Sequence, residues 1–366
     1  MMAFSSSSPP SALLSCCSIQ LMKKPLMNKR LSASRKSFTL MLSILLPLGF
    51  IACPGGSERG NKGGSPPPAA NASPSPQASA QQIAFDGERA FEHVRKQVEI
   101  GPRPAGSAEL VRAREYITGE LKSYGLNVML DEFHPKTPEG EKKMVNITAE
   151  LAGESSEVVM ISSHYDTKPI KEFRFVGAND GGSSTGALLE LARVIAAKGK
   201  PRYTYWFAFF DGEEAFCHEW TECSNSGSPD NTYGSRHYVR QLKDKKELGR
   251  LRAMILLDMI GYKNLEIPRE ETGTTWINDI IWQTAREMGH GAVFVEQSDN
   301  VTDDHIPFMQ AGVECVDLIQ LGGYPFWHTA EDTLDKISAN SLRTVGEVVL
   351  GSLPRIEQRI STRRGS

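Results

Sequence analysis

The chain has 366 residues and a formal net charge of −3, with 40% hydrophobic and 23% charged residues. This balance is typical of a soluble globular protein with one large domain or two smaller ones, and it shows no basic excess that would favour nucleic acid. Its six cysteines form no C-x-x-C pair, so any bound metal must be held by histidine and carboxylate side chains.

The first 52 residues have the pattern of an export signal. Basic residues precede an apolar run over 38–52 that is short for a membrane span. The run ends in F-I-A-C (50–53), which resembles a bacterial lipoprotein signal with Cys53 as the lipidated residue, and a start at Met27 would give the signal an ordinary length. A simple cleaved signal or a single anchor helix are the alternatives. We expect an exported, membrane-anchored lipoprotein that faces the periplasm or the cell exterior.

Residues 53–81 are expected to form a flexible tether. Most of them are Gly, Ser, Pro, Ala or Asn, which cannot build a hydrophobic core. The remaining residues, 82–361, are long enough for one α/β domain, and no internal repeat divides them.

Within 82–361, apolar strand-like runs alternate with helical patterns. This alternation is typical of a sheet covered on both faces by helices, a three-layer α/β/α sandwich. Ser107 is expected to cap a helix and Gly125 to end it. The predicted helices are 84–99, 107–123, 184–198, 233–244, 274–289, 304–311 and 339–354. The predicted strands are 127–133, 144–151, 157–163, 203–210, 251–258, 292–296 and 313–319.

Several of these predicted strands end in polar clusters. The segment F-F-D-G-E-E-A-F (209–216) places three carboxylates within four residues, directly after an aromatic run. Like charges this close repel each other unless a cation or a proton compensates them. Active sites of open α/β sheets gather beyond the carboxyl ends of the strands, where this and four other segments supply candidate residues. The candidates are His164, Asp166, Asp180, Glu213, Glu214, Asp258 and His328.

A set of histidines and carboxylates of this kind suits zinc, with a position left open for substrate or water. Of two adjacent glutamates, one can bind the metal while the other moves protons. Each segment alone has an ordinary explanation: a histidine after a strand is commonly hydrogen-bonded, an acidic loop is commonly solvated, and Asn-Asp before glycines is commonly a turn. Their occurrence at five successive junctions between the sheet and its loops favours a metal site.

The order H-Y-D, N-D-G, E-E, D and H resembles metallopeptidase family 28, the zinc aminopeptidases, and its relatives the glutaminyl-peptide cyclotransferases. The resemblance runs from G-P-R-P-A-G-S (101–107) to the last predicted helix. Segments similar to the cyclotransferases include F-F-D-G-E-E-A-F, D-D-H-I-P-F (303–308) and Trp327 before His328. The resemblance implies a zinc exopeptidase-like fold with a central mixed sheet, and it makes 82–361 a zinc-dependent catalytic domain.

The resemblance to the cyclotransferases also implies roles for individual residues. Asp180, Glu214 and His328 would hold one zinc ion. Glu213 would be the general acid and base, Asp258 and Asp303 would form a hydrogen-bond network beside it, and Trp327 would line the substrate pocket. In a cyclotransferase site, Asp258 and Asp303 would share a short hydrogen bond, and His164 would lie next to the metal ligands without binding the metal itself.

The two-metal aminopeptidases use the same positions differently. Asp180 would bridge two zinc ions, and His164 and Asp258 would complete the second site. Since the chain retains all these ligand types, one zinc is expected and two are possible.

The sequence also departs from these families. G-A-N-D-G-G-S-S-T-G (177–186) looks more like the aminopeptidases, and Ser163 and Thr185 stand where the animal cyclotransferases have a disulfide. A lengthened segment after Glu214 contains Cys217 and Cys223, which could form a disulfide or remain two thiols. Trp220 is shifted by one residue from the position of a pocket aromatic in the cyclotransferases.

We favour a glutaminyl-peptide cyclotransferase, which converts the N-terminal Gln of a peptide or protein to pyroglutamate and releases ammonia, acting as a monomer. The alternative is a zinc aminopeptidase, in which Glu213 takes a proton from water that attacks the first peptide bond.

The sequence disfavours two other functions, a serine hydrolase and a non-enzymatic scaffold. G-S-S-T-G (182–186) matches the nucleophile elbow of α/β-hydrolases, but a charged loop rather than a strand precedes it. A non-enzymatic scaffold on this fold would usually have lost a ligand or the acid/base glutamate, and none is missing.

Overall fold

The computed structural model describes residues 84–224 and 229–363, all of which belong to the compact unit Pro76–Ser366. The predicted signal (1–52), the lipidation site Cys53 and the tether (53–81) lie outside the described residues. No helix among the described residues is both long and apolar enough to cross a membrane.

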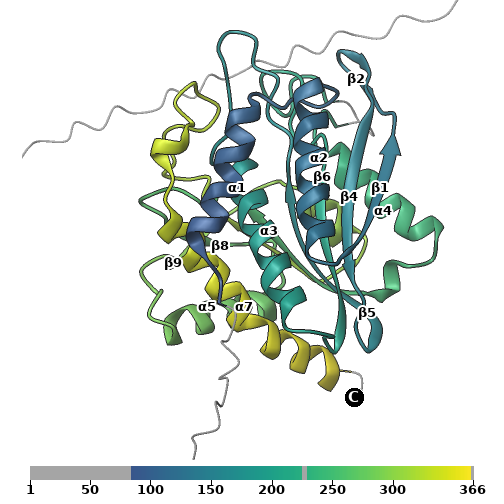
Figure 1. Ribbon diagram of the computed structural model, residues 1–366, viewed down its shortest axis with the longest axis vertical. Coiled ribbons are helices and arrows are strands. Elements are labelled where there is room, and N and C mark those ends of the chain that lie inside the picture. The colour runs from purple at the N-terminus through teal and green to yellow at the C-terminus, as the bar shows by residue number, and fades with distance from the viewer. Residues whose placement is uncertain (1–83, 225–228, 364–366) are drawn as a thin grey trace, which may run out of the picture. The chain divides into compact units, whose positions relative to one another are not determined.

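A six-stranded mixed sheet forms the centre of the described domain (Figure 1). Its strand order is β1-β4-β6-β5-β7-β10. The first two strands run antiparallel to their neighbours, whereas β6, β5, β7 and β10 are parallel to one another. In that order the strands are Asn127–Phe133, Met144–Leu151, Tyr203–Phe210, Ser155–His164, Leu251–Asp258 and Cys315–Ile319.

Helices cover both faces of this sheet, which confirms the three-layer α/β/α sandwich. The larger hydrophobic cluster joins one face to five helices, and a smaller cluster joins the other face to two. The first group is α1 (Gly87–Ile100), α2 (Ala108–Ser123), α3 (Gly182–Ala197), α5 (Thr275–Glu287) and α7 (Ala339–Thr362). The second group is α4 (Tyr233–Asp244) and α6 (His305–Gln310).

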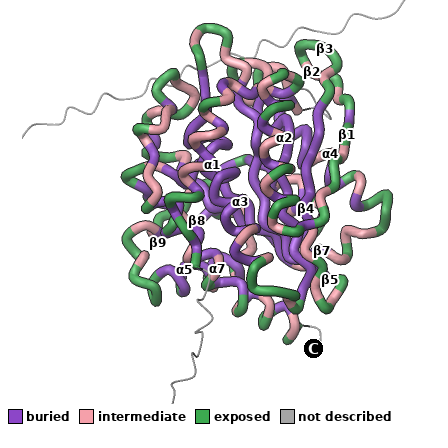
Figure 2. The backbone as a smooth tube through the Cα atoms, in the orientation of Figure 1, coloured by how far each residue is buried: buried purple, intermediate pink, exposed green. Residues whose placement is uncertain are grey.

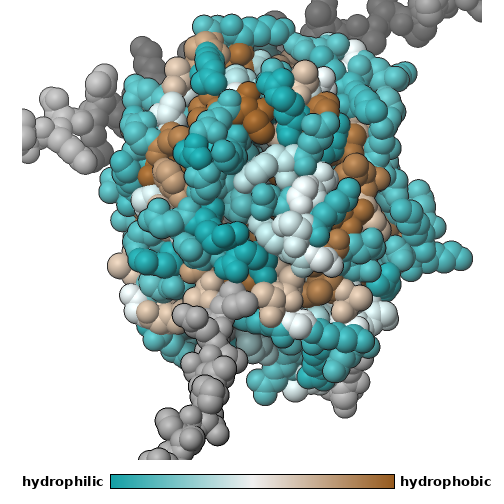
Figure 3. Space-filling model, viewed as in Figure 1, coloured by the Kyte–Doolittle hydropathy of each residue, from teal (hydrophilic) through white to brown (hydrophobic). Residues whose placement is uncertain are grey.

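The side chains of β5 show why the sheet needs cover on both faces. Successive residues of a strand point to opposite faces. Accordingly Val159 and Ile161 belong to the larger cluster, while Val158 and Met160 belong to the smaller one. The neighbouring strand β6, which is aromatic along most of its length, is buried throughout. Burial follows the strands and the inner sides of the helices, and the exposed residues gather in loops (Figure 2). On the face drawn in Figure 3, hydrophilic residues predominate and hydrophobic ones form small groups.

Two of the predicted helix signals are confirmed. The Ser107 side chain accepts the N–H of Leu110 at 3.0 Å and so caps α2. Gly125 follows the end of α2 with φ +79°, a conformation that favours glycine.

The predicted end of the last helix at residue 354 is wrong. α7 continues to Thr362 with Pro354 inside it, and Ile356 and Ile360 remain buried in the main core. The apolar face of the helix therefore extends past Pro354, the residue at which the predicted helix ends.

A few short elements were not predicted from the sequence. The hairpin of β2 (Lys136–Thr137) and β3 (Gly140–Glu141) is one of them, and β8 (Ile267–Glu270) is another. The strand predicted at 292–296 forms as β9 (Phe294–Asp299), but it pairs with β8 in a separate two-stranded sheet.

Candidate active site

The parallel strands of the sheet deliver the acidic and histidine residues to one edge. His164 is the last residue of β5 and Asp258 the last residue of β7, while Glu213 and Glu214 follow β6 closely. Asp180 comes from the turn before α3, and His328 comes from the loop after β10. The site therefore forms at the carboxyl ends of parallel strands, as the sequence predicts.

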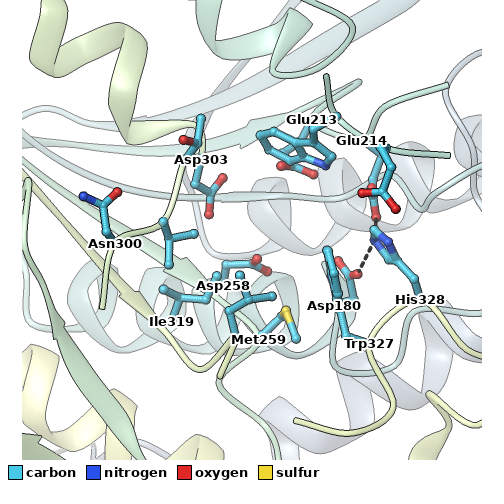
Figure 4. Close-up of a pocket in the computed structure, with 15 residues that line it drawn as sticks. Asp180, Glu213, Glu214, Asp258, Met259, Asn300, Asp303, Ile319, Trp327 and His328 are labelled. Carbon is cyan, nitrogen blue, oxygen red and sulfur yellow. Dashed lines mark hydrogen bonds and ion pairs between the residues drawn. The ribbon is translucent and has the colours of Figure 1, made fainter. Parts of the chain in front are cut away.

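The first group of ligand atoms comes from Asp180, Glu214 and His328. His328 Nε2 lies 3.3 Å from Asp180 Oδ2 and 3.2 Å from Glu214 Oε1 (Figure 4). Within the described ranges, Asp180 Oδ2 and Glu214 Oε2 are buried without a well-aligned hydrogen bond, and their nearest cationic groups are His328 at 3.3 Å and Lys168 at 3.9 Å. One imidazole and two carboxylates that converge in this way fit a zinc site with an open position. His328 has φ +52°, a strained backbone that is commonly found at functional sites.

The charges of this group hold a proton on His328 when no cation is present. Burial disfavours the charged imidazolium, but the carboxylates of Glu214 and Asp180 outweigh that effect and raise the pKa of His328 to about 9. Burial alone would raise the pKa of Asp180. Hydrogen bonds and charge interactions with His164 and His328 outweigh burial and hold this pKa well below its usual range.

A second group of ligand atoms lies beside the first one and shares Asp180 with it. His164 Nε2 is 3.2 Å from Asp258 Oδ1 and 3.3 Å from Asp180 Oδ1. The two oxygens of Asp180 thus face two different histidines, which is the arrangement of a bridging carboxylate. His164 could therefore be a ligand of a second ion, or a hydrogen-bonding neighbour of Asp180 in a one-metal site.

Glu213 lies in the same pocket but stands apart from the first group of ligand atoms. Its carboxylate is buried, and its nearest charged partner is His164 Nδ1 at 3.8 Å. Burial raises the pKa of Glu213 well above its ordinary value, and the neighbouring carboxylate of Glu214 adds to this effect. A buried glutamate with a raised pKa is suited to taking a proton from a substrate and returning it.

Asp166 positions the two glutamates through their backbone. Its two carboxylate oxygens accept the N–H groups of Glu213 at 3.2 Å and of Glu214 at 3.4 Å. The turn before them needs glycine, because Gly212 has φ +73° and an added Cβ would lie 2.5 Å from Met144 Sδ.

Asp211, the first carboxylate of the acidic segment, has a structural role. Its Oδ2 accepts the N–H of Val145 at 2.7 Å, and its own N–H donates to Asn146 Oδ1 at 3.1 Å. These bonds join the end of β6 to the start of β4. Of the three acidic residues in the segment, only the two glutamates therefore face the pocket.

Asp332 is a positioning residue that the sequence analysis did not single out. Its oxygens accept the N–H groups of Asn179 at 2.8 Å and of Asp180 at 3.1 Å, and the Tyr324 hydroxyl donates to it at 2.6 Å. Burial and the nearby charge of Asp180 raise the pKa of Asp332 to about 6. Asp332 lies in the segment W-H-T-A-E-D-T together with His328, which is the signal that could have identified it.

The expected short hydrogen bond between Asp258 and Asp303 is not formed in the described structure. Asp258 contacts His164 instead, while Asp303 accepts the N–H of Asp304 and its side chain is hydrogen-bonded to that of Asp317. Burial and the charge of Asp258 raise the pKa of Asp303 to about 7. The buried Asp317 lies beyond it, and burial together with Asp303 raises the pKa of Asp317. Asp303 thus belongs to a buried acidic cluster, but the expected pairing is wrong.

A cavity of about 230 Å³ lies at the edge of the sheet, and six of the acidic and histidine residues line it: Asp180, Glu213, Glu214, Asp258, Asp303 and His328. Trp327 lines it, stacks on His328 with ring centroids 4.1 Å apart, and is 40% exposed. Trp220 also lines this cavity, so the shift by one residue does not remove it from the pocket. Cys217 and Cys223 form a disulfide in the loop that carries Trp220.

Ser184, the serine of the nucleophile-elbow pattern, makes only structural contacts. It accepts a hydrogen bond from Ser163 at 2.8 Å and donates to the carbonyl of Gly181 at 3.4 Å. It sits in the first turn of α3, and a loop precedes it rather than a strand. The geometry excludes the strand-turn-helix elbow at this serine.

The fold and the paired ligand groups define an enzyme of the zinc exopeptidase-like class. The model of Peptidase family M28 matches residues 146–353, and the chain belongs to this family. The glutaminyl-peptide cyclotransferase of Drosophila melanogaster is 29% identical over 272 residues, which cover 67% of this chain and 75% of the relative. These findings also make the chain a glutaminyl-cyclase-like member of the family.

Solved structures show the same relationship. A glutaminyl cyclase from an Acidobacteriales bacterium is 35% identical, with a TM-score of 0.71 over 77% of this chain and 98% of that one. A Zn-dependent exopeptidase from Parabacteroides distasonis is 27% identical, with a TM-score of 0.67 over 74% of this chain and 98% of that one.

Proposed function

We propose that the protein is a zinc-dependent glutaminyl-peptide cyclotransferase, which converts an N-terminal glutamine to pyroglutamate. The observation that carries this proposal is the position of Glu213, whose buried carboxylate shares a pocket with the ligand group of Asp180, Glu214 and His328 but forms no part of it. The similarity to glutaminyl cyclases supports the choice of this reaction over hydrolysis.

In this proposal Glu213 moves the proton that the cyclisation must transfer. The α-amine of the glutamine attacks its own γ-carboxamide carbon, so a new C–N bond forms and the bond to the amide nitrogen breaks. Glu213 takes one proton from the attacking amine and delivers it to the departing nitrogen, which leaves as ammonia. The raised pKa of Glu213 suits both halves of this transfer.

Asp180, Glu214 and His328 would hold the zinc ion. The buried oxygens of Asp180 and Glu214, which lack a well-aligned hydrogen bond in the described structure, support this assignment. When bound there, zinc would polarise the γ-carbonyl and offset the negative charge that develops on its oxygen. Asp166 and Asp332 fix the backbone that carries these ligands, and Trp327 would pack against the substrate.

A zinc aminopeptidase is the second candidate, and one observation favours it. The group of His164, Asp180 and Asp258 is complete, and Asp180 has the geometry of a bridge between two ions. In that enzyme Glu213 would take a proton from water, which would then attack the first peptide bond. Free amino acid would be the product, and no ammonia would appear.

One assay of the purified protein separates these two reactions. Peptides with N-terminal glutamine are incubated with it, and both ammonia and pyroglutamyl peptide are measured. The cyclotransferase forms them in equal amounts. A protein that instead released free amino acids from these peptides would be an aminopeptidase.

We also propose that the enzyme acts outside the cytoplasm as a monomer, on a lipid anchor at Cys53. The disulfide between Cys217 and Cys223 supports export, because disulfides persist in oxidising compartments. Globomycin, which inhibits the lipoprotein signal peptidase, tests the anchor: a processed lipoprotein would accumulate as a larger precursor. Unchanged processing would contradict the lipoprotein assignment.

A further inference from the structure

A second, larger hollow continues from the catalytic cavity. Its volume is about 750 Å³, and four residues line both it and the cavity: Glu219, Trp220, Trp327 and His328. Two loops form its walls, one over 168–173 and the other over 216–220. We call this hollow the side groove. A volume of this size is large enough for a ligand of several residues.

The two walls of the side groove are held together by a buried lysine. Lys168 Nζ donates to the carbonyls of Ala215 and Cys217, both at 3.1 Å. The N–H of Cys217 donates to Asp230 Oδ2 at 2.9 Å, and the disulfide closes the loop that carries Trp220. The groove is therefore a preformed feature of the fold, and little order would have to be gained on binding.

The charged side chains that line the side groove already make contacts within the protein. Lys168 is buried and donates to the loop carbonyls, Lys171 pairs with Glu139 at 2.6 Å, and Glu172 accepts the N–H of Lys171 at 3.2 Å. The rest of the lining includes six apolar and aromatic side chains, of which five are half-buried and one is exposed: Pro169, Ile170, Phe173, Phe216, Trp220 and the exposed Trp327. Trp327, at the junction with the catalytic cavity, leaves 40% of its surface exposed. A rigid aromatic surface of this kind favours an apolar ligand over a charged one.

We infer that the side groove is a specificity subsite for the peptide chain that follows the N-terminal residue, and that it selects an apolar or aromatic side chain at the second or third position. The inference rests on the proposed function, since it requires the N-terminal residue to occupy the catalytic cavity. A bound peptide must leave this cavity, and the shared residues make the groove a continuous path for it. Trp327 then contacts both the first residue and its successor.

Peptide series on the unmodified full-length protein test this inference without any substitution. Gln-amide lacks a second residue, so its turnover reports on the proposed function alone. The ratio of kcat/KM for Gln-Phe-Gly-amide or Gln-Gly-Phe-amide to that for Gln-Gly-Gly-amide reports on the groove. We expect one of these ratios to reach roughly tenfold or more, and the corresponding Glu peptides to gain nothing over Gly. If Gln-amide is converted while both ratios stay near one, the groove inference fails and the function stands.

If Gln-amide and the Gln peptides release no ammonia, the proposed function fails, and the groove inference, which rests on it, fails too.

A double substitution then assigns the preference to the groove wall. Ile170→Ala with Phe173→Ala should lower the ratio for the preferred peptide towards one. Leu130→Ala on the edge strand β1 removes an exposed apolar side chain that does not line the groove and should keep the ratio of the unmodified protein. Thermal melting of each variant establishes that it is folded. A folded double variant that retained the full preference would contradict the assignment, and if the variant does not fold, the peptide series alone decides.

Discussion

Oδ1 of Asp180 lies 3.3 Å from Nε2 of His164, and this contact brings the second histidine of the site into reach of a metal. The other oxygen of Asp180 faces His328 at the same distance. A carboxylate with both oxygens directed at imidazoles is suited to bridging two ions, yet it serves equally well as a ligand of one ion with a hydrogen bond to the other histidine. If two ions bind, His164 is a ligand of the second one. If one ion binds, His164 only forms a hydrogen bond with Asp180.

The first prediction concerns His164. In a one-zinc cyclotransferase, His164→Ala removes a hydrogen-bonding neighbour of Asp180 but no ligand, so zinc stays bound and turnover falls by roughly 10- to 100-fold. Zinc analysis together with kcat measures both effects. Loss of one of two bound zinc ions, with activity abolished, would show that His164 is a ligand.

The second prediction separates the two glutamates. Glu213→Gln keeps the shape of the side chain but removes the proton acceptor, so we expect an intact zinc content and turnover lowered by roughly 10²- to 10⁴-fold. Glu214→Gln is the matched control, because it weakens the ligand group and should lower the affinity for zinc. An active Glu213→Gln variant would contradict the proposed division of roles.

The third prediction is a dependence of stability on pH that arises from Asp303. Its pKa is about 7 in the folded protein and about 3.9 in an unfolded chain, because burial and Asp258 disfavour its charge. A raised folded pKa means that the stability contribution is complete below about pH 4 and is lost as the pH rises to about 7. Asp303→Asn should therefore gain in Tm over the unmodified metal-free protein from pH 4 to 7, with no further gain above that.

A suitable control for this series is Asp335→Asn, an exposed carboxyl whose pKa is lowered to about 2 by Lys336 and Thr333. Its effect on Tm should change little between about pH 5 and 7, since this carboxyl is ionised there in both the folded and the unfolded chain. A constant Tm difference for Asp303→Asn over the same range would show that its pKa is not raised by folding.

The fourth prediction concerns the tether. A chain that begins near Gln81 should keep the kcat of the full-length protein, because all the site residues belong to the domain that follows. Kinetics of the two purified forms with the same peptide check this. Lost activity in a folded short form would give the preceding residues a part in catalysis.

Much of the site could be predicted from the sequence because its residues follow strands. Parallel strands end at a common edge, so residues at or just after the ends of β5, β6 and β7 are expected to lie close together. This argument places His164, Glu213, Glu214 and Asp258. The three-layer arrangement follows in the same way from apolar strands that alternate with amphipathic helices.

The rest depended on contacts between residues far apart in the chain. Asp332 reaches Asn179 and Asp180 across more than 150 residues, and no local pattern indicates that pairing. The direction of the Asp258 carboxylate, towards His164 rather than Asp303, is likewise set by packing that the sequence does not reveal. Helix α7 continues through Pro354 because burial of its apolar face outweighs the tendency of proline to end a helix.

The most direct test of the central claim is a paired assay of the purified protein with a Gln peptide and with Leu-amide, combined with its zinc content. The account predicts ammonia and pyroglutamyl peptide from the Gln peptide, no leucine from Leu-amide, and one zinc ion per chain. Free leucine from Leu-amide, no ammonia from the Gln peptide and two bound zinc ions would contradict it and identify an aminopeptidase.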